Sequence, residues 1–450
     1  MHHLRNVALL MLAAFAAPLR ADAPNIVFII ADDLGWADVG FHGGNAPTPN
    51  LDRLAAEGLE LTQHYVAPVC SPTRTGLMTG RCWSRFNVTS PQNNRALPWD
   101  TVTLPRALKS VGYDTCLTGK WHLGSTPQTG PNHFGFDYSY GSLAGGVGPW
   151  DHAYKQGPFV RTWHRNEQLV TEAGHVTDLI TQEAVRWLGE RQERPYFLYV
   201  PFTAVHLPVK EPDEWLAKVP AGIQGDVARH YAACIMHLDD AVGRIVSAVR
   251  ESGRANDTLL VFTSDNGGST AENNGQAYPP DNYPEGPLPG NNRPLRGEKG
   301  SLYEGGIRVP TLVSWPGKLK PGKSDVAVQI TDWMPTLTAL AGYRPVADLR
   351  WDGTSIWPAI TGEGTLAERA LYWTAPGFRS RAVRVGEWKL IAYRGNGNRP
   401  KYELFHVARD PRETTDLAAQ MPDKVTELSR RLEDMARADG DSAVREPRPQ

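Results

Sequence analysis

Continuous apolar segments alternate along this chain with segments of helical periodicity. Apolar and β-branched residues fill Asn25–Ala31, and residues 259–263 have the same composition, which is typical of strands buried on both faces. Residues 226–251 instead repeat apolar side chains at helical spacing and stop just before Gly253. Because such strands alternate with helices, we predict an α/β fold, with a large, mostly parallel sheet sandwiched by helices.

Weaker patterns predict further elements between these segments. Strands are expected at residues 113–118 and 196–200, and helices at residues 51–58, 103–110 and 177–191. Asn50 is the expected cap of the first of these helices. Residues 279–294 are rich in Pro, Gly and Asn and predict an irregular loop.

The pattern changes in the last quarter of the chain. Short alternating stretches at residues 382–385 and 389–393 precede a helical stretch at residues 422–436. We therefore predict a small α+β C-terminal subdomain at residues 346–450, following a larger α/β domain at residues 24–345.

The N-terminal residues have the form of a secretory signal peptide. Arg5 precedes an apolar run at residues 7–17, and Ala21-Asp22-Ala23 is a small-x-small cleavage site. A buried first helix is the alternative, but Pro18 interrupts it and no residue caps it. We predict that residues 1–23 are a signal peptide and that the mature chain is exported.

The cysteine content and the hydropathy of the chain indicate the cellular compartment in which the protein resides. The four cysteines are unevenly spaced, which argues against a disulfide framework, and none forms a CxxC pair for zinc. So few cysteines in an exported chain of 450 residues suit a bacterial periplasm. No later segment has an apolar run of membrane length, so we expect no stable membrane insertion.

Charge and composition exclude two classes of protein. The chain has 47 Lys and Arg against 49 Asp and Glu, a net charge of −2, and no basic run. Nucleic-acid binders depend on neutralising phosphates, so we expect no nucleic-acid partner. With 41% hydrophobic and 21% charged residues, the chain has ordinary globular composition, which excludes disorder for most of it.

Acidic and amide side chains follow two of the predicted strands. Asp32 and Asp33 come directly after the first strand, and Asp265 and Asn266 follow the strand at residues 259–263. In open α/β folds, ligands bind beyond the carboxyl ends of the strands. Oxygen ligands of this kind suit Ca²⁺ or Mg²⁺ rather than zinc. Solvated turn carboxylates are the alternative for either pair alone.

A short segment at residues 70–74, with the sequence CSPTR, indicates an anion site. Pro72 suits the first turn of a helix, which puts Cys70 at the helix N-terminus, where free N–H groups favour negative charge. A buried core cysteine would be the default interpretation of a lone Cys. Arg74 lies one helical turn further on and favours the anion site instead.

Further basic side chains lie where strands are expected to end. Lys120 and His122 are two residues apart, so an extended chain presents both on one face. His206 follows the strand predicted at residues 196–200, and Lys299 follows the irregular loop. Each alone is more often structural than catalytic, but together with an acidic cluster they predict an active site.

The chain resembles the type I sulfatases of the alkaline phosphatase superfamily. CSPTR at residues 70–74 matches the CxPxR signature of that family, and LMTGR at residues 77–81 is its usual continuation. GYDT and GKWHLG at residues 112–124 match a second signature. The likeness extends over nearly the whole mature chain. Within the family, GWADVGFHGG, FLYVPFTAVHLPVKEP and NNRPLRGEKGSLYEGG resemble arylsulfatase B, the N-acetylgalactosamine-4-sulfatase.

This resemblance implies an alkaline phosphatase-like fold and a set of functional residues. A maturase is expected to convert Cys70 to Cα-formylglycine, whose hydrate is the nucleophile. Residues implied as ligands of Ca²⁺, with Mg²⁺ as the alternative, are Asp32, Asp33, Asp265 and Asn266, together with the modified Cys70. Residues implied to act on the sulfate ester are Arg74, Lys120 and Lys299 as cations, His206 as proton donor and His122 as proton acceptor.

The resemblance specifies the substrate-binding residues less closely than the metal ligands and the nucleophile. Family members often hold sulfate with a serine, and both Ser139 and Ser142 lie near the expected place. Lys120, His206 and Lys299 are also expected to contact the sulfated group. His152 within Trp150-Asp151-His152, and the loop at residues 272–293, are candidates for binding sugar.

The resemblance therefore implies an exported sulfatase acting on a sulfated carbohydrate. The expected bond is a 4-O-sulfate of a galactose-type sugar, in chondroitin or dermatan fragments or in a galactan such as carrageenan. A phosphodiester or phosphonate monoester hydrolase with the same nucleophile is one alternative. An inactive sulfoglycan-binding protein is another, although every position of the catalytic set is filled.

Overall fold

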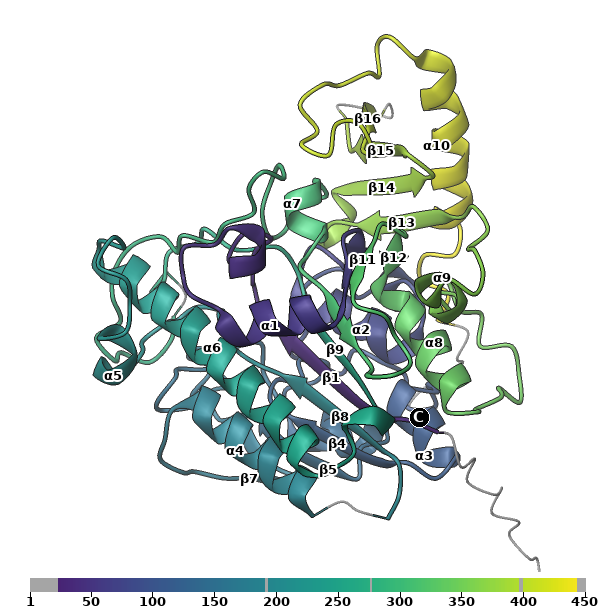
Figure 1. The fold of residues 1–450 in the computed structure, drawn as a ribbon. Helices are drawn as coiled ribbons and strands as arrows, with labels where there is room; N and C mark the ends of the chain where they lie inside the picture. Colours follow the sequence, from purple (N-terminus) through teal and green to yellow (C-terminus); the bar gives the residue numbers. More distant parts are fainter. Residues whose placement is uncertain (1–22, 191–192, 276, 396–399, 443–450) are drawn as a thin grey trace, which may run out of the picture.

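The computed structural model describes residues 23–190, 193–275, 277–395 and 400–442. Its main element is a ten-stranded sheet in the order β11-β2-β10-β9-β1-β8-β4-β5-β6-β7 (Figure 1). In chain order, the bounds of these strands are β1 Asn25–Ala31, β2 Leu59–Leu61, β4 Asp114–Thr118, β5 Tyr138–Ser142, β6 Trp163–Arg165, β7 Gln168–Leu169, β8 Tyr196–Pro201, β9 Thr258–Ser264, β10 Leu312–Ser314 and β11 Gly322–Ser324. The central strands β9, β1, β8, β4 and β5 are all parallel, as predicted.

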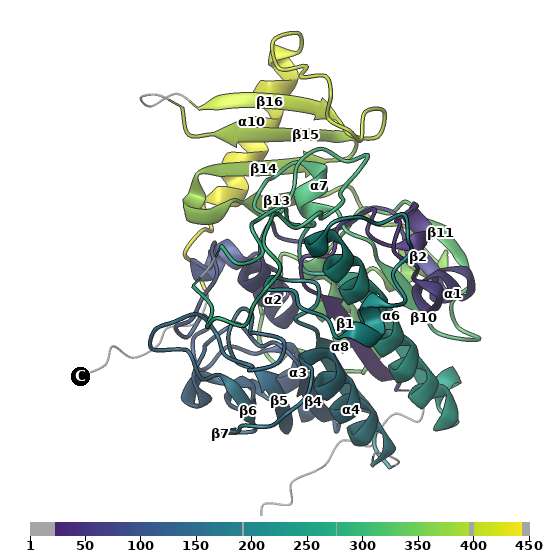
Figure 2. The same ribbon diagram turned by 90° about the vertical axis from the view of Figure 1, so that its left-hand side faces the viewer.

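Helices cover both faces of this sheet (Figures 1 and 2). The α-helices of this part of the chain are α1 Pro49–Glu57, α2 Cys70–Thr79, α3 Leu104–Ser110, α4 Val176–Gly189, α5 Asp213–Leu216, α6 Asp226–Glu251, α7 Glu304–Ile307, α8 Trp333–Leu340 and α9 Trp357–Thr361. Two short strands, β3 (His64–Tyr65) and β12 (Val328–Gln329), pair separately. Residues 279–294 contain no helix or strand, as predicted.

Alternate side chains of β1 enter two different hydrophobic cores. Ile26, Phe28 and Ile30 pack on the face covered by α2, α3 and α8. Val27 and Ile29 pack on the opposite face, which α1, α4 and α6 cover. Successive side chains of a strand point to opposite faces, so a strand covered on both sides must be apolar throughout. The apolar run that follows Asn25 in β1 is a consequence of this position.

The first helix begins earlier than predicted, and its N-terminus is stabilised differently. α1 starts at Pro49 with Thr48 as its N-cap, so Asn50 is not the cap. Instead, the Asp239 carboxylate of α6 accepts hydrogen bonds from the backbone N–H groups of Asn50, at 3.1 Å, and Leu51, at 2.8 Å. A carboxylate supplied by another helix cannot be read from the local sequence of α1.

A four-stranded antiparallel sheet forms the C-terminal part. Its strands are β13 Ala370–Thr374, β14 Ser380–Val385, β15 Trp388–Tyr393 and β16 Lys401–His406, in that order, and α10 (Pro422–Ala436) packs against it (Figure 2). This agrees with the α+β pattern of the sequence. The proposed signal peptide at residues 1–23 lies outside the described residues except for Ala23. Among the described helices, none is long and apolar enough to cross a membrane.

A buried ion-pair triad joins this sheet to the rest of the molecule. Lys389 of β15 lies 2.9 Å from Glu304 Oε1 of α7 and 2.9 Å from Glu413 Oε1, and the three side chains are buried. Burial raises the pKa of Glu413 to about 7, although Lys389 opposes this rise. The lysine is the counter-ion that permits two carboxylates to lie side by side.

We expect Lys389→Met to lower the free energy of unfolding by about 3–5 kcal/mol, because it removes the buried counter-ion of Glu413 and leaves Glu304 with Arg308, 3.5 Å away, as its remaining ion-pair partner. Urea unfolding of Lys389→Met, of a control variant and of the parent measures this free energy. Lys401→Met is the matched control, since Lys401 lies on neighbouring β16 and is largely exposed, and it should change stability by less than about 0.5 kcal/mol. Equal stability of Lys389→Met and the parent would refute this role.

Candidate active site

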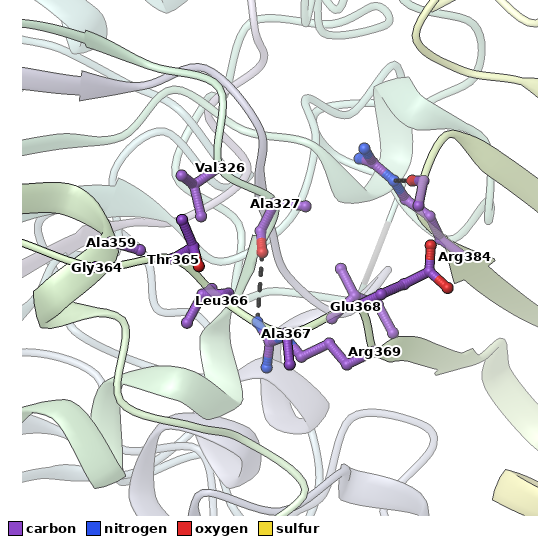
Figure 3. A pocket seen from close by; sticks show the side chains of 12 residues that line it. Val326, Ala327, Ala359, Gly364, Thr365, Leu366, Ala367, Glu368, Arg369 and Arg384 are labelled. Carbon is purple, nitrogen blue, oxygen red and sulfur yellow. Dashed lines mark hydrogen bonds between the residues drawn. The ribbon is translucent and has the colours of Figure 1, made fainter. Parts of the chain in front are cut away.

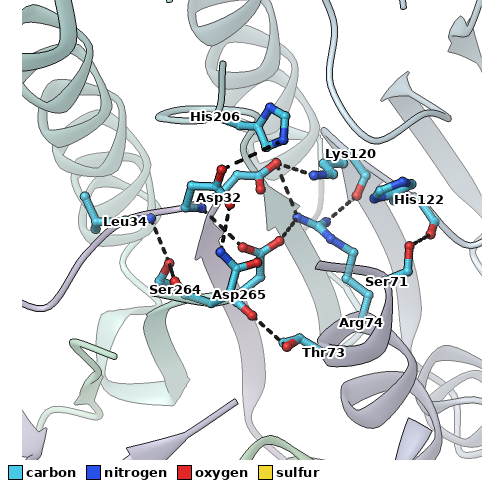
Figure 4. A network of polar contacts seen from close by, with 12 residues as sticks. Asp32, Leu34, Ser71, Thr73, Arg74, Lys120, His122, His206, Ser264 and Asp265 are labelled. Carbon is cyan, nitrogen blue, oxygen red and sulfur yellow. Dashed lines mark hydrogen bonds and ion pairs between the residues drawn. The ribbon is translucent and has the colours of Figure 1, made fainter. Parts of the chain in front are cut away.

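The acidic residues meet because their two strands are neighbours. β1 and β9 run parallel, with Ala31 paired to Ser264, so the residues that follow each strand leave the sheet at the same edge. Asp32, Asp33, Asp265 and Asn266 are 0–1% exposed. The backbone N–H of Asp33 donates to Asp265 Oδ1 at 3.3 Å. The sequence-predicted acidic cluster is therefore assembled (Figure 4).

A left-handed residue lets both adjacent aspartates face this cluster. Asp33 has a φ of 61°, whereas an extended chain would direct Asp32 and Asp33 to opposite sides. The Asn266 amide donates from Nδ2 to Asp33 Oδ1 at 2.7 Å. That bond fixes the amide and leaves its oxygen as a free acceptor.

Two oxygens of the cluster are buried and have no hydrogen-bond partner. They are Asp32 Oδ1 and Asn266 Oδ1. Burial and the neighbouring Asp265 raise the pKa of Asp32 to about 8, although Lys120 opposes this. Unpaired buried acceptors are costly, and a bound cation relieves both the missing contacts and the crowding of negative charge. The donor set fits a hard cation such as Ca²⁺ or Mg²⁺.

Cys70 is the first residue of α2, as predicted from Pro72, and it is buried. Burial raises the pKa of its thiol, and the positive charges of Lys120 and Lys299 offset this only in part. The unmodified thiol therefore remains protonated at neutral pH and is a poor nucleophile. Its interactions with Lys120, Lys299, Asp265 and Asp32 place it within electrostatic reach of the cluster.

Two hydroxyls fix the N-terminal turn of α2 against the strand ends. The Thr73 hydroxyl donates to the carbonyl of Asp265 at 2.6 Å and accepts from the N–H of Ala67 at 2.8 Å. The Ser71 hydroxyl donates to the carbonyl of His122 at 2.9 Å. Both residues belong to the CSPTR segment, and these bonds could not be predicted from it because their partners lie elsewhere in the chain.

Three cations pair with the carboxylates of the cluster. Arg74 Nη2 lies 2.8 Å from Asp265 Oδ2, and its Nη1 donates to the carbonyl of Lys120 at 2.7 Å. Lys120 pairs with Asp32. Lys299 Nζ lies 2.7 Å from Asp33 Oδ2. Lys299 comes from the segment after the irregular loop, so distant parts of the chain converge here.

The two histidines expected to transfer protons, His206 and His122, both lie at this site but in different environments. His206 Nε2 is 3.8 Å from Asp33 Oδ2, and its Nδ1 bonds to the carbonyl of Leu207. The two ring nitrogens of His122 are buried and have no hydrogen-bond partner. Burial, with nearby Lys120, lowers the pKa of His122 well below its usual value. His122 is therefore neutral at pH 7 and able to accept a proton.

The comparisons with known proteins decide the family. A family model described as Sulfatase matches residues 24–343, and one described as N-sulphoglucosamine sulphohydrolase, C-terminal, matches residues 297–438. Arylsulfatase J of Mus musculus is 33% identical over 91% of this chain and 75% of its own length. The chain belongs to the sulfatase family. It is a sulfuric ester hydrolase.

Two further relatives of this sulfatase bear on its substrate. The N-acetylgalactosamine-6-sulfatase of Canis lupus familiaris is 33% identical over 86% of this chain and 74% of its own length. The crystal structure of Ps i-CgsB in complex with k-i-k-neocarrahexaose has a TM-score of 0.81 and 32% identity, and each chain is covered over 94% of its length.

Three residues predicted to bind substrate make other contacts in this sulfatase. The Ser139 hydroxyl donates to Asn132 Oδ1 at 2.6 Å and contacts His164 Nε2 at 3.0 Å. Ser142 accepts from the N–H of Ala144 at 3.1 Å. His152 stacks on Trp163 and bonds through Nε2 to the carbonyl of Gly174 at 2.9 Å. None of the three is paired with the acidic cluster.

Residues above the site were missed in the sequence. Lys155 Nζ lies over the rings of Tyr154, at 5.5 Å, and Tyr278, at 6.0 Å. Burial lowers the pKa of Lys155, and nearby Lys299 lowers it further. The Tyr278 hydroxyl is buried without a partner, and a Cβ added at Gly146 would come within 2.7 Å of it. Tyr278 belongs to the 272–293 loop that the sequence singled out.

A separate cavity of about 510 Å³ lies away from these residues (Figure 3). Val326, Leu366, Arg369 and Arg384 are among the residues that line it, and no residue of the acidic cluster does. Its two arginines are already engaged: Arg369 pairs with Asp332, and Arg384 donates to the Tyr65 hydroxyl. This cavity is therefore separate from the candidate active site.

Proposed function

We propose that this sulfatase hydrolyses a sulfate ester on a galactose-type sugar of a sulfated carbohydrate. The observation that carries the catalytic part of the proposal is the position of Cys70, at the N-terminus of α2 and within electrostatic reach of two lysines and two aspartates. We further propose that a maturase converts Cys70 to formylglycine and that the protein is exported before it acts.

The proposed cation and the modified cysteine supply chemistry that ordinary side chains lack. Asp32, Asp33, Asp265 and Asn266 would hold Ca²⁺, which supplies positive charge to a nucleophilic hydroxyl and to a sulfate oxygen. The hydrated aldehyde at position 70 supplies that hydroxyl, and a second one on the same carbon. The orphaned oxygens of Asp32 and Asn266 support this assignment.

The cations orient the sulfate group and balance its charge. Lys120 and Lys299 flank the cluster and are ion-paired to Asp32 and Asp33, so their ammonium groups are fixed before substrate binds. Donors that are already oriented toward developing negative charge stabilise a transition state without reorganisation. Arg74, fixed by Asp265 and the Lys120 carbonyl, holds the first turn of α2 in place.

The two histidines are assigned opposite proton transfers. His122 is neutral and lacks hydrogen-bond partners, which suits a residue that removes a proton from the second hydroxyl at position 70. His206 is proposed to protonate the departing sugar oxygen. Burial and nearby Lys299 lower its pKa, so the negative charge of bound substrate is needed to bring a proton to it.

The substrate class follows from the relatives. One carries the name N-acetylgalactosamine-6-sulfatase, and Ps i-CgsB is solved with a neocarrahexaose, an oligosaccharide of a galactan. Both point to galactose-type sugars. The motif likeness to arylsulfatase B favours O4 as the sulfated position, whereas the name of the first relative favours O6. We propose O4 and treat O6 as the competing outcome.

Sulfate release from 4-sulfated and 6-sulfated chondroitin disaccharides, compared side by side, tests this proposal. Mass spectrometry of the Cys70 peptide must first establish that the aldehyde is present. Release from the 4-sulfate alone supports O4, and release from the 6-sulfate alone overturns it. If neither is cleaved, galactan fragments bearing 4-sulfate are the next substrate, and failure there removes the galactose-type assignment.

The rival activity is tested in the same assay. A phosphodiester or phosphonate monoester hydrolase would prefer aryl phosphate diesters to aryl sulfate. A sulfatase with the arrangement proposed here should show the opposite ratio of kcat/KM. Binding of sulfated sugar without turnover, by protein that carries the aldehyde, would instead favour a sulfoglycan-binding protein.

A further inference from the structure

A second cluster of histidine and carboxylate side chains lies where α4 packs against α6 (Figure 1). His175 is the N-cap of α4, Asp178 lies in its first turn, and His237 lies within α6. One ligand atom from each residue lies within 4.8 Å of the other two. The two histidines are 3% and 1% exposed, and the Asp178 side chain is 32% exposed. The cluster is therefore buried but reachable from solvent through Asp178.

The ring nitrogens of the two histidines differ in their partners. His175 Nδ1 accepts a hydrogen bond from the backbone N–H of Thr177 at 3.4 Å, a bond that metal binding through Nε2 would break. His237 Nδ1 lies 2.8 Å from Glu211 Oε2 and can donate to it, which leaves Nε2 as the nitrogen that would exchange a proton for a metal. His237 Nε2 and His175 Nε2 are both buried without a hydrogen-bond partner. His237 Nε2 lies 3.5 Å from Asp178 Oδ1, and His175 Nε2 lies 3.5 Å from Glu211 Oε1.

Aromatic side chains hold the two imidazoles in place. The rings of His175 and His237 stack at 4.9 Å, and Trp215 stacks on the other side of His237 at 4.7 Å. Trp150 packs edge-on against His175. Ligands whose rotamers are already fixed by packing lose little entropy when they bind a metal.

We propose that His175, Asp178 and His237 bind a divalent transition metal of the zinc class, with Glu211 positioning His237. Two imidazole nitrogens favour Zn²⁺, Ni²⁺ or Cu²⁺ over the hard cations that suit the all-oxygen cluster at the ends of β1 and β9. A carboxylate behind the distal nitrogen of a ligating histidine is the usual support for such a ligand.

Binding requires a small contraction of the cluster. Zinc bonds of roughly 2.0–2.2 Å place neighbouring ligand atoms about 3.5 Å apart, so ligand atoms up to 4.8 Å apart must move together by about an ångström. Asp178 can supply that movement because its side chain is the partly exposed member. Glu211 is five residues after His206, so a metal here would fasten that segment to α4 and α6.

A proton on His237 competes with the metal for this cluster. A positively charged His237 would lie between Glu211 and Asp178, and Arg244 Nη1 lies 3.2 Å from Asp178 Oδ1. In that state the cluster is an ion-pair network that holds α4 to α6 without a metal. The experiment must separate these two states.

Zinc titration of the full-length, chelator-treated protein, with calcium saturating, is the test. We expect one zinc per chain in the parent by calorimetry, with a rise in Tm. His237→Gln should weaken zinc affinity by about 100-fold or more, and Glu211→Gln by about 10–100-fold. His133→Gln, which changes a partly exposed histidine elsewhere, is the matched control and should bind as the parent does.

Absence of zinc binding by the parent, or equal affinity in the parent and His237→Gln, would overturn the proposal. If His237→Gln does not fold, Asp178→Asn serves instead, because that side chain is partly exposed and its shape is conserved. Cobalt substitution gives an independent reading, since a mixed nitrogen and oxygen site of low coordination has a visible absorption band that Asp178→Asn should alter. None of these measurements depends on sulfatase activity.

Discussion

Cys70→Ala is expected to lower sulfate release by on the order of 10⁴-fold or more, because no other side chain can replace the nucleophile. Cys70→Ser should behave differently and turn over once. A sulfated serine must be attacked at sulfur by water. The sulfated hydrate instead keeps one hydroxyl on the same carbon, and loss of that hydroxyl's proton expels sulfate and restores the aldehyde. We therefore expect Cys70→Ser to accumulate as a sulfated enzyme.

Mass spectrometry of the peptide that contains residue 70 measures this outcome after incubation with aryl sulfate. The expected result is a peptide heavier by one sulfuryl group, with a single burst of product. Cys82→Ser is the matched control, since Cys82 is also buried and its sulfur lies 4.0 Å from the Tyr372 carbonyl, which a serine hydroxyl can also approach. Steady multiple turnover by Cys70→Ser would contradict the account.

The position of Cys70 could be predicted because its determinants are local. Pro72 specifies the first helical turn, and the apolar runs before Asp32 and Asp265 specify two buried parallel strands. Ligands bind beyond the carboxyl ends of such strands, which made the acidic residues candidates. For either pair alone solvated turn carboxylates remained the alternative, and the CSPTR segment with the basic residues favoured a site.

Features that depend on distant partners could not be predicted. β10 and β11 have three residues each, too short to show a period of two, and they are strands only because β2 and β9 pair with them. Ser139 was a candidate for binding sulfate, but its hydroxyl is engaged by Asn132 and His164. No property of the local sequence around residue 139 indicates those partners.

Tyr278 and Lys155 illustrate the same limit at the site itself. Each lies in a segment without regular structure, and their contact depends on two loops that are far apart in the chain. The sequence singled out the 272–293 loop from its composition and its place after a strand. It could not indicate which side chain of that loop points to the site, because a loop has no periodicity.

The second large effect is expected when divalent cations are removed. Chelation should lower sulfatase activity by about 10³-fold, since a metal at such a site contributes several kcal/mol of transition-state stabilisation. Calcium alone should restore the activity. Zinc should not, because the all-oxygen cluster of Asp32, Asp33, Asp265 and Asn266 favours a hard cation. Initial rates before and after add-back are the measurement.

Asp32→Asn separates loss of this cation from other effects of chelation. The substitution keeps the shape of the side chain but removes one ligand charge, so calcium should bind more weakly and its effect on Tm should shrink. Asp240→Asn is the control, because Asp240 belongs to the other adjacent pair of aspartates, on the surface of α6. Full activity after exhaustive chelation would refute a metal role, and an equal response of Asp32→Asn and the parent to calcium would place the ion elsewhere.

Since Asp32 also neutralises buried Lys120, a fall in stability that calcium cannot reverse is expected in Asp32→Asn alone.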